Sequence, residues 1–590
     1  MENNFEKKIC QNCNGEFIID PDDFSFYEKI KVPPPTFCPE CRLQRRMAWR
    51  NERTLYKRKC DLCEKNIIAI YHESVPFPVY CRECWYGDDW DPTDYGQDYD
   101  FSKSFFEQFK EFSNTVPKLA LWQRNAINSE YSNMCGECKN VYLSCSVVKD
   151  SENVFYSKCV DKSKDIVDCL NIINGSESLY ENVEAQNNYN SQYLLLCRSC
   201  LDSYYCVDCI NCSNCFLSNN LRNKQFCIRN RQYTKEDYFK EIEKFNLKSR
   251  TSRDVLMKEF AEIKKLAIYR FGNITRAINS TGNNLLNVKN CQNCFEIYNV
   301  ENASYCYRAF DFKDSMDFDY GQKAELLYEY TTGALNDYNV KFTYSAMESV
   351  RNADYTESCQ NGNNLFGCIS LRNTNNAILN KVYTKEEYEK LREKIIKQMS
   401  EVPFLDKLGR KYEYGEFFPI EISPFVYNES LAREFFPLTK TEAEKNGYPW
   451  REPEVKNFKI TISANKIPDN IDDVNEDILE EVLECAHKRK CNHMCGIAFR
   501  ITNYEFNFYK KHNIPLPILC PNCRHYERFK VMPALKLWKR TCMCGSLGSP
   551  STTTNHFHGT EKCEVEFETS YTPDRPEIVY CEKCYQQEIY

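Results

Sequence analysis

The chain contains 590 residues, 35 of them cysteine, and has a formal net charge of -8 at pH 7. This length suits about four domains of roughly 150 residues each. The negative charge excludes a protein that coats nucleic acid over its whole surface, although it allows a local basic patch. The sequence has no run of 18 or more apolar residues and no signal peptide, so we expect a cytoplasmic protein that does not contact the membrane.

Four Cys-x-x-Cys pairs in the first 86 residues predict two tetrahedral zinc sites. Such a site needs four ligands, and each pair supplies two thiolates from one tight turn. Without a secretion signal, paired cysteines are more typical of metal ligands than of disulfides, and the odd cysteine total also argues against a fully paired disulfide framework. Disulfides and an iron–sulfur cluster are the alternatives. The predicted ligands are Cys10, Cys13, Cys38 and Cys41, and then Cys60, Cys63, Cys81 and Cys84.

The C-terminal segment repeats this cysteine pattern. A span of 24 residues separates Cys13 from Cys38 and Cys495 from Cys520, and 18 residues follow both Cys41 and Cys523 before the next cysteine. The repetition predicts two more structural zinc sites, up to four in all, with His493 as an alternative to Cys491. The predicted ligands are Cys491, Cys495, Cys520 and Cys523, and Cys542, Cys544, Cys581 and Cys584. Further candidates are His487, His556, His558 and Cys563, which could equally be turn and surface residues.

The agreement between the two segments extends beyond cysteine. Phe17, Phe26, Tyr27, Pro33, Pro35 and Arg42 fall where Phe499, Phe508, Tyr509, Pro515, Pro517 and Arg524 do. With Gly15 and the flanking cysteines, this pattern resembles the probable zinc-ribbon, or treble-clef, zinc-finger family. The resemblance implies a zinc site but no particular activity. The whole chain also resembles uncharacterised cysteine-rich bacterial zinc-ribbon proteins.

A strongly basic segment follows Cys41 and predicts a helix. Such a helix could bind the phosphates of RNA or DNA, with Trp49 and Tyr56 available to stack on bases. The alternative is a solvated helix that pairs with the acidic residues between Asp88 and Asp100. The predicted nucleic-acid contacts are Arg42, Arg45, Arg46, Arg50, Arg53, Lys57 and Arg58.

Two β-rich repeats are predicted between the cysteine-rich ends. Strand-like pieces recur about every 13 residues over 125–232, which indicates a solenoid with inward Cys, Ser and Val, or else a two-sided stack of sheets. A phrase beginning LRN at 221 returns at 371, and Thr234 and Thr384 each predict the start of a closing helix. One column of the register is predicted to contain Val141, Val154, Val167, Tyr180, Tyr193 and Cys206.

The predicted fold class is therefore multidomain α+β. The expected units are a double zinc-ribbon domain (1–100), a first solenoid with capping helices (101–275), a second solenoid with a capping helix (276–400), a connector rich in Pro and aromatics (401–475) and a second double zinc-ribbon domain (476–590). Helices are also expected over 101–113 and 253–271. Ile478, Val482 and Cys485 share a face of another predicted helix, so Cys485 is expected to be a buried thiol and not a ligand.

The sequence favours a non-enzymatic, macromolecule-binding or scaffold protein whose zinc is structural. No histidine occurs between His72 and His487, so both solenoids lack the commonest general base, and we predict no catalytic residue. The partner is expected to be a protein or a nucleic acid. The alternative is an enzyme that uses an acidic solenoid groove or a redox or iron–sulfur centre in the cluster from Cys197 to Cys215. The acidic candidates are Asp311, Asp314, Asp317 and Asp319.

Overall fold

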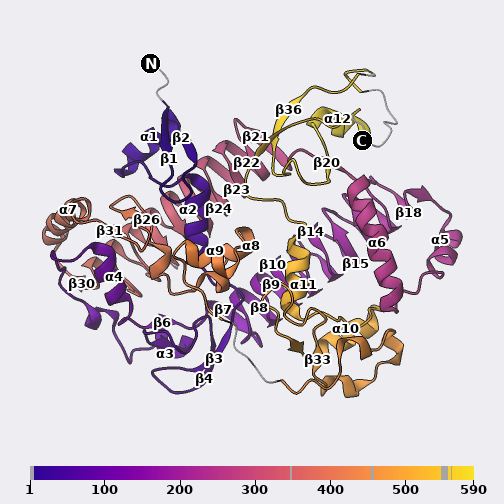
Figure 1. Cartoon of the computed structure of the whole chain (residues 1–590), viewed down its shortest axis with the longest axis horizontal. Coiled ribbons are helices and arrows are strands. Elements are labelled where there is room, and N and C mark those ends of the chain that lie inside the picture. The colour runs from indigo at the N-terminus through magenta and orange to yellow at the C-terminus, as the bar shows by residue number, and fades with distance from the viewer. Residues whose placement is uncertain (1–4, 346–347, 453–457, 546–555, 560) are drawn as a thin grey trace.

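The computed structural model describes residues 5–345, 348–452, 458–545, 556–559 and 561–590. Two parallel β-solenoids form the centre of the molecule, and cysteine-rich segments surround them (Figure 1). The solenoids touch, since Arg308 of the second donates a hydrogen bond to Asn171 of the first at 2.9 Å. The mixed α+β architecture with central solenoids and cysteine clusters at the ends confirms the coarse prediction.

The first solenoid is a 13-stranded sheet whose strands pair in parallel except at its last hairpin. Its strands are β7 (Gln123–Ile127), β8 (Asn133–Tyr142), β9 (Cys145–Phe155), β10 (Lys158–Asp161), β11 (Lys164–Val167), β12 (Leu170–Ile173), β13 (Glu177–Tyr180), β14 (Val183–Gln186), β15 (Tyr189–Leu195), β16 (Tyr204–Val207), β17 (Ser213–Phe216), β18 (Gln225–Ile228) and β19 (Arg231–Gln232).

The second solenoid is a 10-stranded sheet built in the same way. Its strands are β21 (Ile274–Ile278), β22 (Gly282–Gln292), β23 (Cys294–Ser304), β24 (Tyr307–Gln322), β25 (Glu325–Thr331), β26 (Tyr338–Tyr344), β27 (Arg351–Asp354), β28 (Asn363–Phe366), β29 (Asn375–Ile378) and β30 (Lys381–Val382).

A corner at every third residue sets the shape of both solenoids. Asn211, Asn214, Leu217 and Asn220 all have φ between 48° and 54°, in the left-handed region that asparagine tolerates better than most residues. Paired residues are 12 apart along most of the chain, as for Cys215 opposite Cys227, so each turn has four three-residue sides. The side chain that follows each of the first three of these corners is buried inside the solenoid, as for Cys212, Cys215 and Ser218.

The predicted 13-residue column is only partly correct. Val141 pairs with Val154, and Val167 pairs with Tyr180, both 13 apart. Val154, however, pairs with Ile166 and not with Val167, so the column shifts by one position there. Turns of two slightly different lengths follow one another in this region, and an average period cannot place every turn.

A helix closes each solenoid, as predicted, and a short antiparallel hairpin precedes it. Thr234 and Thr384 precede α5 and α7, and each hydroxyl accepts a hydrogen bond from the backbone N–H three residues on. The carboxylate of Glu387 in turn accepts a hydrogen bond from the backbone N–H of Thr384, which completes a capping box. The helices of this central region are α4 (Phe105–Ser113), α5 (Lys235–Ile242), α6 (Arg250–Leu266) and α7 (Lys385–Glu401), so the helices predicted at 101–113 and 253–271 are confirmed with small shifts.

The connector after the second solenoid has little regular structure. Two short helices, α8 (Ala432–Phe435) and α9 (Lys440–Lys445), occur in it, and α9 ends just before Gly447. The short strand pairs β5 (Val79–Tyr80) with β6 (Lys118–Leu119), β20 (Ile268–Arg270) with β37 (Ile578–Tyr580) and β31 (Phe404–Leu405) with β32 (Lys411–Tyr412) tie the connecting segments to their neighbours.

The cysteine-rich ends are made of short hairpins, each followed by a helix. The helix predicted around Ile478 is wrong, because the chain forms a 3-10 turn over Glu476–Leu479 and then enters a strand. The N-terminal elements are β1 (Glu6–Ile9), β2 (Glu16–Ile19), α1 (Pro21–Ile30), α2 (Pro39–Met47), β3 (Tyr56–Lys59), β4 (Asn66–Ala69), β5 and α3 (Arg82–Tyr86). The C-terminal elements are β33 (Leu483–Glu484), β34 (Ala498–Phe499), α10 (Asn503–Lys511), α11 (Pro521–Phe529), β35 (Trp538–Thr541), β36 (Glu566–Thr569), β37 and α12 (Glu582–Ile589).

Each cysteine-rich end packs on the solenoid that is farther from it along the chain. Tyr27 of the N-terminal segment meets Tyr328 of the second solenoid edge to face, with ring centroids 5.6 Å apart. Tyr509 of the C-terminal segment meets Tyr180 of the first solenoid in the same way at 5.9 Å. In Figure 1, α2 lies against the second solenoid, left of the centre, and α11 lies against the first, right of the centre.

Candidate metal centres and the arginine contacts beside them

Four groups of four cysteines bring their sulfur atoms close enough to share a metal ion, with all ligand atoms of a group within 4.8 Å of one another. Four sulfurs at about 2.3 Å around a tetrahedral zinc ion lie roughly 3.8 Å apart. A disulfide would need about 2.05 Å, and all 35 cysteines are free. The measured Sγ–Sγ distances are 3.8 Å for Cys13 and Cys38, 3.9 Å for Cys63 and Cys81, 3.8 Å for Cys485 and Cys523, and 4.0 Å for Cys563 and Cys581. The groups are Cys10, Cys13, Cys38 and Cys41; Cys60, Cys63, Cys81 and Cys84; Cys485, Cys495, Cys520 and Cys523; and Cys542, Cys563, Cys581 and Cys584.

The first and third groups share one local structure. The first two ligands lie in the turn of a hairpin, β1–β2 or β33–β34, and the third ligand is the N-cap of a helix, Cys38 for α2 and Cys520 for α11. The backbone N–H of Cys38 donates to the sulfur of Cys10 at 3.2 Å, and that of Cys520 donates to the sulfur of Cys485 at 3.3 Å. The contact with Cys485 lowers the pKa of Cys520 to about 7, which favours the thiolate that a metal ion binds.

The second and fourth groups form another matched pair. Cys81 and Cys581 are the N-caps of α3 and α12. Their backbone N–H groups donate to the sulfurs of Cys60 and Cys542, at 3.2 Å in both cases. Helix N-termini carry partial positive charge, so all four groups lie where thiolates are stabilised.

In the third group the structure differs from the sequence prediction. Cys485 takes the position equivalent to Cys10, and Cys491 lies beside the group instead of in it. Cys485 is fully buried, as expected, but it also belongs to the ligand set. The equal separations from Cys13 to Cys38 and from Cys495 to Cys520 identified Cys495 as the second ligand, but no spacing in the sequence identified Cys485 as the first.

The fourth group differs in the same way. Cys563 takes the position that Cys63 has at the other end, and Cys544 lies outside the four. Both Cys63 and Cys563 precede the next ligand by 18 residues, a separation that would have identified Cys563. Cys544 instead contacts the Nδ1 atom of His556 at 2.9 Å, and the other ring nitrogen of His556 contacts Glu588 at 2.9 Å. The two nitrogens of His558 have no hydrogen-bond partner among the described residues.

A fifth group lies against the third. Its members are His487, Cys491, His493 and Cys523, so it shares Cys523 with the third group. The sequence prediction treated the two histidines as surplus candidates, and the structure brings both of them within reach of a common ion.

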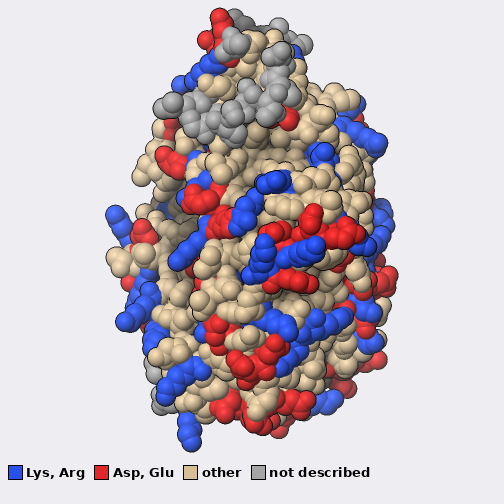
Figure 2. Space-filling model, turned by 90° about the vertical axis from the view of Figure 1, so that its right-hand side faces the viewer, with Lys and Arg blue, Asp and Glu red and all other residues tan. Residues whose placement is uncertain are grey.

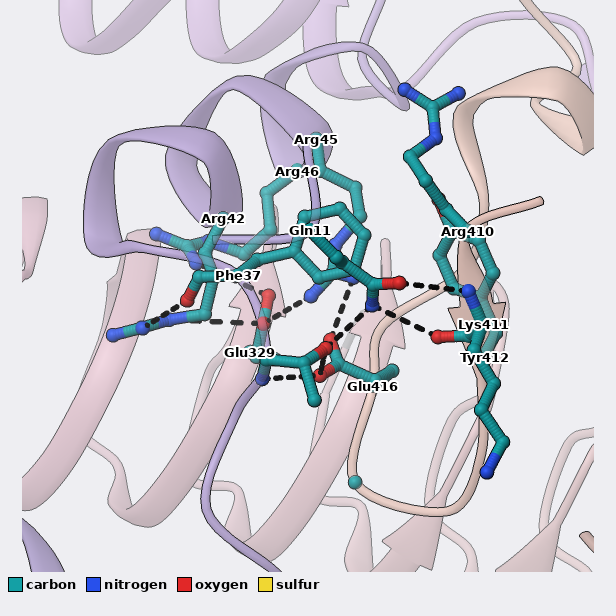
Figure 3. A network of polar contacts seen from close by, with 12 residues as sticks. Gln11, Phe37, Arg42, Arg45, Arg46, Glu329, Arg410, Lys411, Tyr412 and Glu416 are labelled. Carbon is teal, nitrogen blue, oxygen red and sulfur yellow. Dashed lines mark hydrogen bonds and ion pairs between the residues drawn. The ribbon is translucent and has the colours of Figure 1, made fainter. Parts of the chain in front are cut away.

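The basic residues after Cys41 are buried against the second solenoid. Arg42, Arg45 and Arg46 are each about 1% exposed or less and point from α2 toward carboxylates (Figure 3). Asp317 accepts from Arg42 at 2.8 Å and from Arg46 at 2.9 Å, and Arg46 also contacts Asp319. Arg45 bridges Glu329 at 2.6 Å and Glu416 at 2.8 Å.

The C-terminal segment makes the equivalent contacts with the first solenoid. Arg524 and Arg528 of α11 point at Asp168, at 3.1 Å and 2.9 Å, and Arg528 also reaches Glu181 at 3.0 Å. Arg42 and Arg524 each directly follow the fourth cysteine of their group, and the guanidinium of each also lies over a tyrosine ring. Each cysteine-rich end therefore packs on its solenoid through arginines of one helix that pair with buried carboxylates.

These contacts involve most of the residues that were predicted for a phosphate-binding surface or for an acidic groove. Four of the seven basic residues, Arg50 included, are at most 2% exposed, and Trp49 is also buried. Arg53 is partly buried and Arg58 pairs with Asp61 at 2.7 Å. Of the four acidic candidates, Asp317 and Asp319 pair with these arginines, and Asp314 pairs with Lys29 at 3.0 Å. Burial raises the pKa of Asp319 to about 6, and Arg46 opposes that rise.

The dense cluster between Cys197 and Cys215 lies inside the first solenoid. All six cysteines are at most 2% exposed and pack with one another and with Leu194. Cys206, for example, donates to the carbonyls of Tyr204 at 3.4 Å and of Cys215 at 3.5 Å. Burial raises the pKa of Cys206 well above that of an exposed thiol. These contacts are those of protonated core thiols.

No family model matches the chain, and no curated protein or solved structure matches it either. None of the helices among the described residues is both long enough and apolar enough to cross a bilayer.

Proposed function

We propose that the four cysteine groups bind structural Zn²⁺ and that the protein is a non-enzymatic scaffold for a macromolecular partner. Four thiolates with no open position suit a structural zinc ion and leave no place for a substrate. One observation carries the proposal: each group lies at the start of a helix, and two of these helices insert arginines into the solenoids. The hairpin whose turn carries the first two ligands of each site, and the helix that begins at the third, support the treble-clef resemblance.

The second solenoid offers a surface on which a partner could bind. A shallow groove of about 810 Å³ runs across β22 to β26. Its rim carries Asn287, Asn299 and Asp311 in one hydrogen-bonded ladder. Exposed ion pairs, such as Lys289 with Glu301 at 2.7 Å, line the same surface. An extended polar surface of this kind suits a protein partner better than a small substrate.

Nucleic-acid binding through the segment after Cys41 finds less support. The arginines at its centre already have carboxylate partners. On the face in Figure 2, positive and negative side chains are interleaved and do not form a broad field of one sign. A phosphate backbone binds best to such a positive field.

Metal analysis and chelation test the structural role of zinc. Purified protein should contain at least four equivalents of zinc, and a strong chelator should lower its melting temperature, because metal binding contributes to the folding free energy of such small sites. Protein that is metal-free yet melts at the same temperature would overturn the proposal.

Charge reversal in the groove tests the scaffold role. Lys289→Glu together with Lys313→Glu should abolish cross-linking to the partner and leave zinc content unchanged. Lys265→Glu, on an exposed face of α6, is the matched control because it reverses a similar surface ion pair with Glu262. If the partner cross-links equally to the groove variant and to the wild type, the groove is not its binding surface.

A further inference from the structure

We propose that a second metal ion binds beside the third cysteine group, held by His487, Cys491 and His493 and sharing the thiolate of Cys523 with the first ion. The proposal rests on the structural zinc sites proposed above and adds an unequal loading of the two ends: one ion in the first group and a thiolate-bridged pair in the third.

The additional ligands all come from one insertion. Two residues, Gln11 and Asn12, separate the first two ligands of the N-terminal group. The nine residues 486–494 separate the equivalent ligands, Cys485 and Cys495. The rest of the site is alike at both ends, so the insertion accounts for the difference.

The sulfur positions fit two ions that share one ligand. The Sγ atom of Cys523 lies 3.8 Å from that of Cys485 and 3.7 Å from that of Cys491. Both distances match two sulfurs on one tetrahedral zinc ion, about 3.8 Å. Cys485 and Cys491 belong to different groups, so Cys523 is placed to serve both.

The two histidines have nitrogen atoms that lack a partner. The Nδ1 atoms of His487 and His493 are buried and accept or donate no hydrogen bond among the described residues. Their rings lie 5.4 Å apart, and His493 stacks on Tyr526 with an interplanar angle of 16°. A carboxylate oxygen of Glu527 lies 3.8 Å from this nitrogen of His493. Buried polar atoms are normally satisfied, and a metal ion would satisfy both of these.

The N-terminal group shows what replaces the second ion. Cys41 occupies the position of Cys523, and the side-chain amide of Asn12 donates to its sulfur at 3.2 Å. An amide donor stabilises a thiolate that serves a single ion. At Cys523 the sulfur of Cys491 approaches to 3.7 Å instead, a separation that suits two sulfur ligands of one tetrahedral zinc ion.

Charge and ligand type both favour zinc as the second ion. Two thiolates and two imidazoles form one of the ordinary structural zinc sets. A zinc ion with four thiolates carries a formal charge of -2, whereas two zinc ions with the five thiolates of the joined groups carry -1. The second ion therefore reduces the negative charge of a largely buried site.

Zinc stoichiometry of the full-length protein tests this proposal. His487→Gln combined with His493→Gln should lower the zinc content by one equivalent per chain, and Cys491→Ser should do the same. His512→Gln, in the same segment but outside the group, is the control and should leave the content unchanged. The melting temperature should show that all variants are folded. Protein without any zinc would contradict both proposals, whereas zinc content that is equal in all variants would contradict only this one.

Discussion

At the residue scale, the main feature is a set of arginines whose partners are far away in the sequence. Arg42 and Asp317 are 275 residues apart. Considered alone, the basic helix suggests a phosphate-binding site and the acidic run suggests a substrate groove. In the folded protein the arginines of the helix form ion pairs with the carboxylates of the run. Sequence patterns identified both charged segments, although the predicted helix ends at Met47, and Lys57 and Arg58 lie in β3. They could not predict that the segments meet, because local periodicity carries no information about contacts at this separation.

Removing one of these arginines should destabilise the protein strongly. Arg46→Met leaves Asp317, Asp319 and Glu329 with less positive charge in a buried site, and we expect a loss of about 3–5 kcal/mol in the free energy of unfolding. Lys29→Met breaks an exposed pair with Asp314 and should cost at most about 1 kcal/mol. Urea denaturation measures both values. A smaller effect for Arg46→Met than for Lys29→Met would contradict the assignment.

Asp337 should make the free energy of unfolding depend on pH. Asp337 is buried in the second solenoid, where it accepts hydrogen bonds from the Tyr330 hydroxyl and the Val350 backbone at 2.8 Å each. Burial raises its pKa to about 7, against about 3.9 in an unfolded chain. The folded state therefore binds more protons between these values, and this residue's contribution to stability is present below pH 4 and is lost as the pH rises through 7.

Asp337→Asn should remove that part of the pH dependence. Relative to the variant, the wild type should lose stability from pH 4 to pH 7 with a slope of up to about 1.4 kcal/mol per pH unit. Urea midpoints of both proteins at pH 5 and pH 8 give the difference. A wild type that gains stability over this range relative to Asp337→Asn would show that the sign is wrong.

At the element scale, the sequence predicted the solenoids better than the metal sites. The repeated phrase and the two capping threonines identified two closed repeats, since both signals are local. The three-residue sides were missed because turns of two slightly different lengths blur the period. In the C-terminal metal sites, Cys491 and Cys544 were predicted as ligands in place of Cys485 and Cys563. The error arose because insertions after Cys485 and after Cys542 lengthen the separation between the first two ligands of each group, which is short at the N-terminal end.

The asparagine ladders give an element-scale prediction. Asn302 has a φ of 55°, accepts from Asn290 at 3.0 Å and donates to Asp314 at 2.8 Å. Asn302→Ala should lose about 1–2 kcal/mol, because a Cβ-bearing residue without a local polar group is disfavoured in the left-handed region. Asn302→Gly loses the same hydrogen bonds but avoids the backbone penalty, so it should be the more stable of the two in thermal unfolding. The reverse order would show that the corner does not limit stability.

At the scale of the whole molecule, metal binding and docking are linked. The ligands Cys38 and Cys520 begin the helices that carry the buried arginines. Loss of the ion should release the start of each helix before it affects the solenoids, whose strands have their own ladder of hydrogen bonds and their own core.

Hydrogen exchange with and without a chelator tests this order of events. Amides of α2 and α11 should lose protection when metal is removed, while those of β15 to β17 in the first solenoid should keep most of theirs. Equal loss in both regions would indicate that the protein unfolds as a single unit without metal.

The crossed docking has a consequence for the covalent chain. A single cleavage between α5 and α6 would divide it into two pieces, each with one cysteine-rich end and all the strands of one solenoid. Arg42 of the N-terminal piece would still pair with Asp317 of the C-terminal piece. Arg524 of the C-terminal piece would likewise pair with Asp168 of the N-terminal piece. The nicked protein should therefore elute from a size-exclusion column as one particle, and the two pieces, expressed separately, should reassemble into the same particle when mixed with zinc.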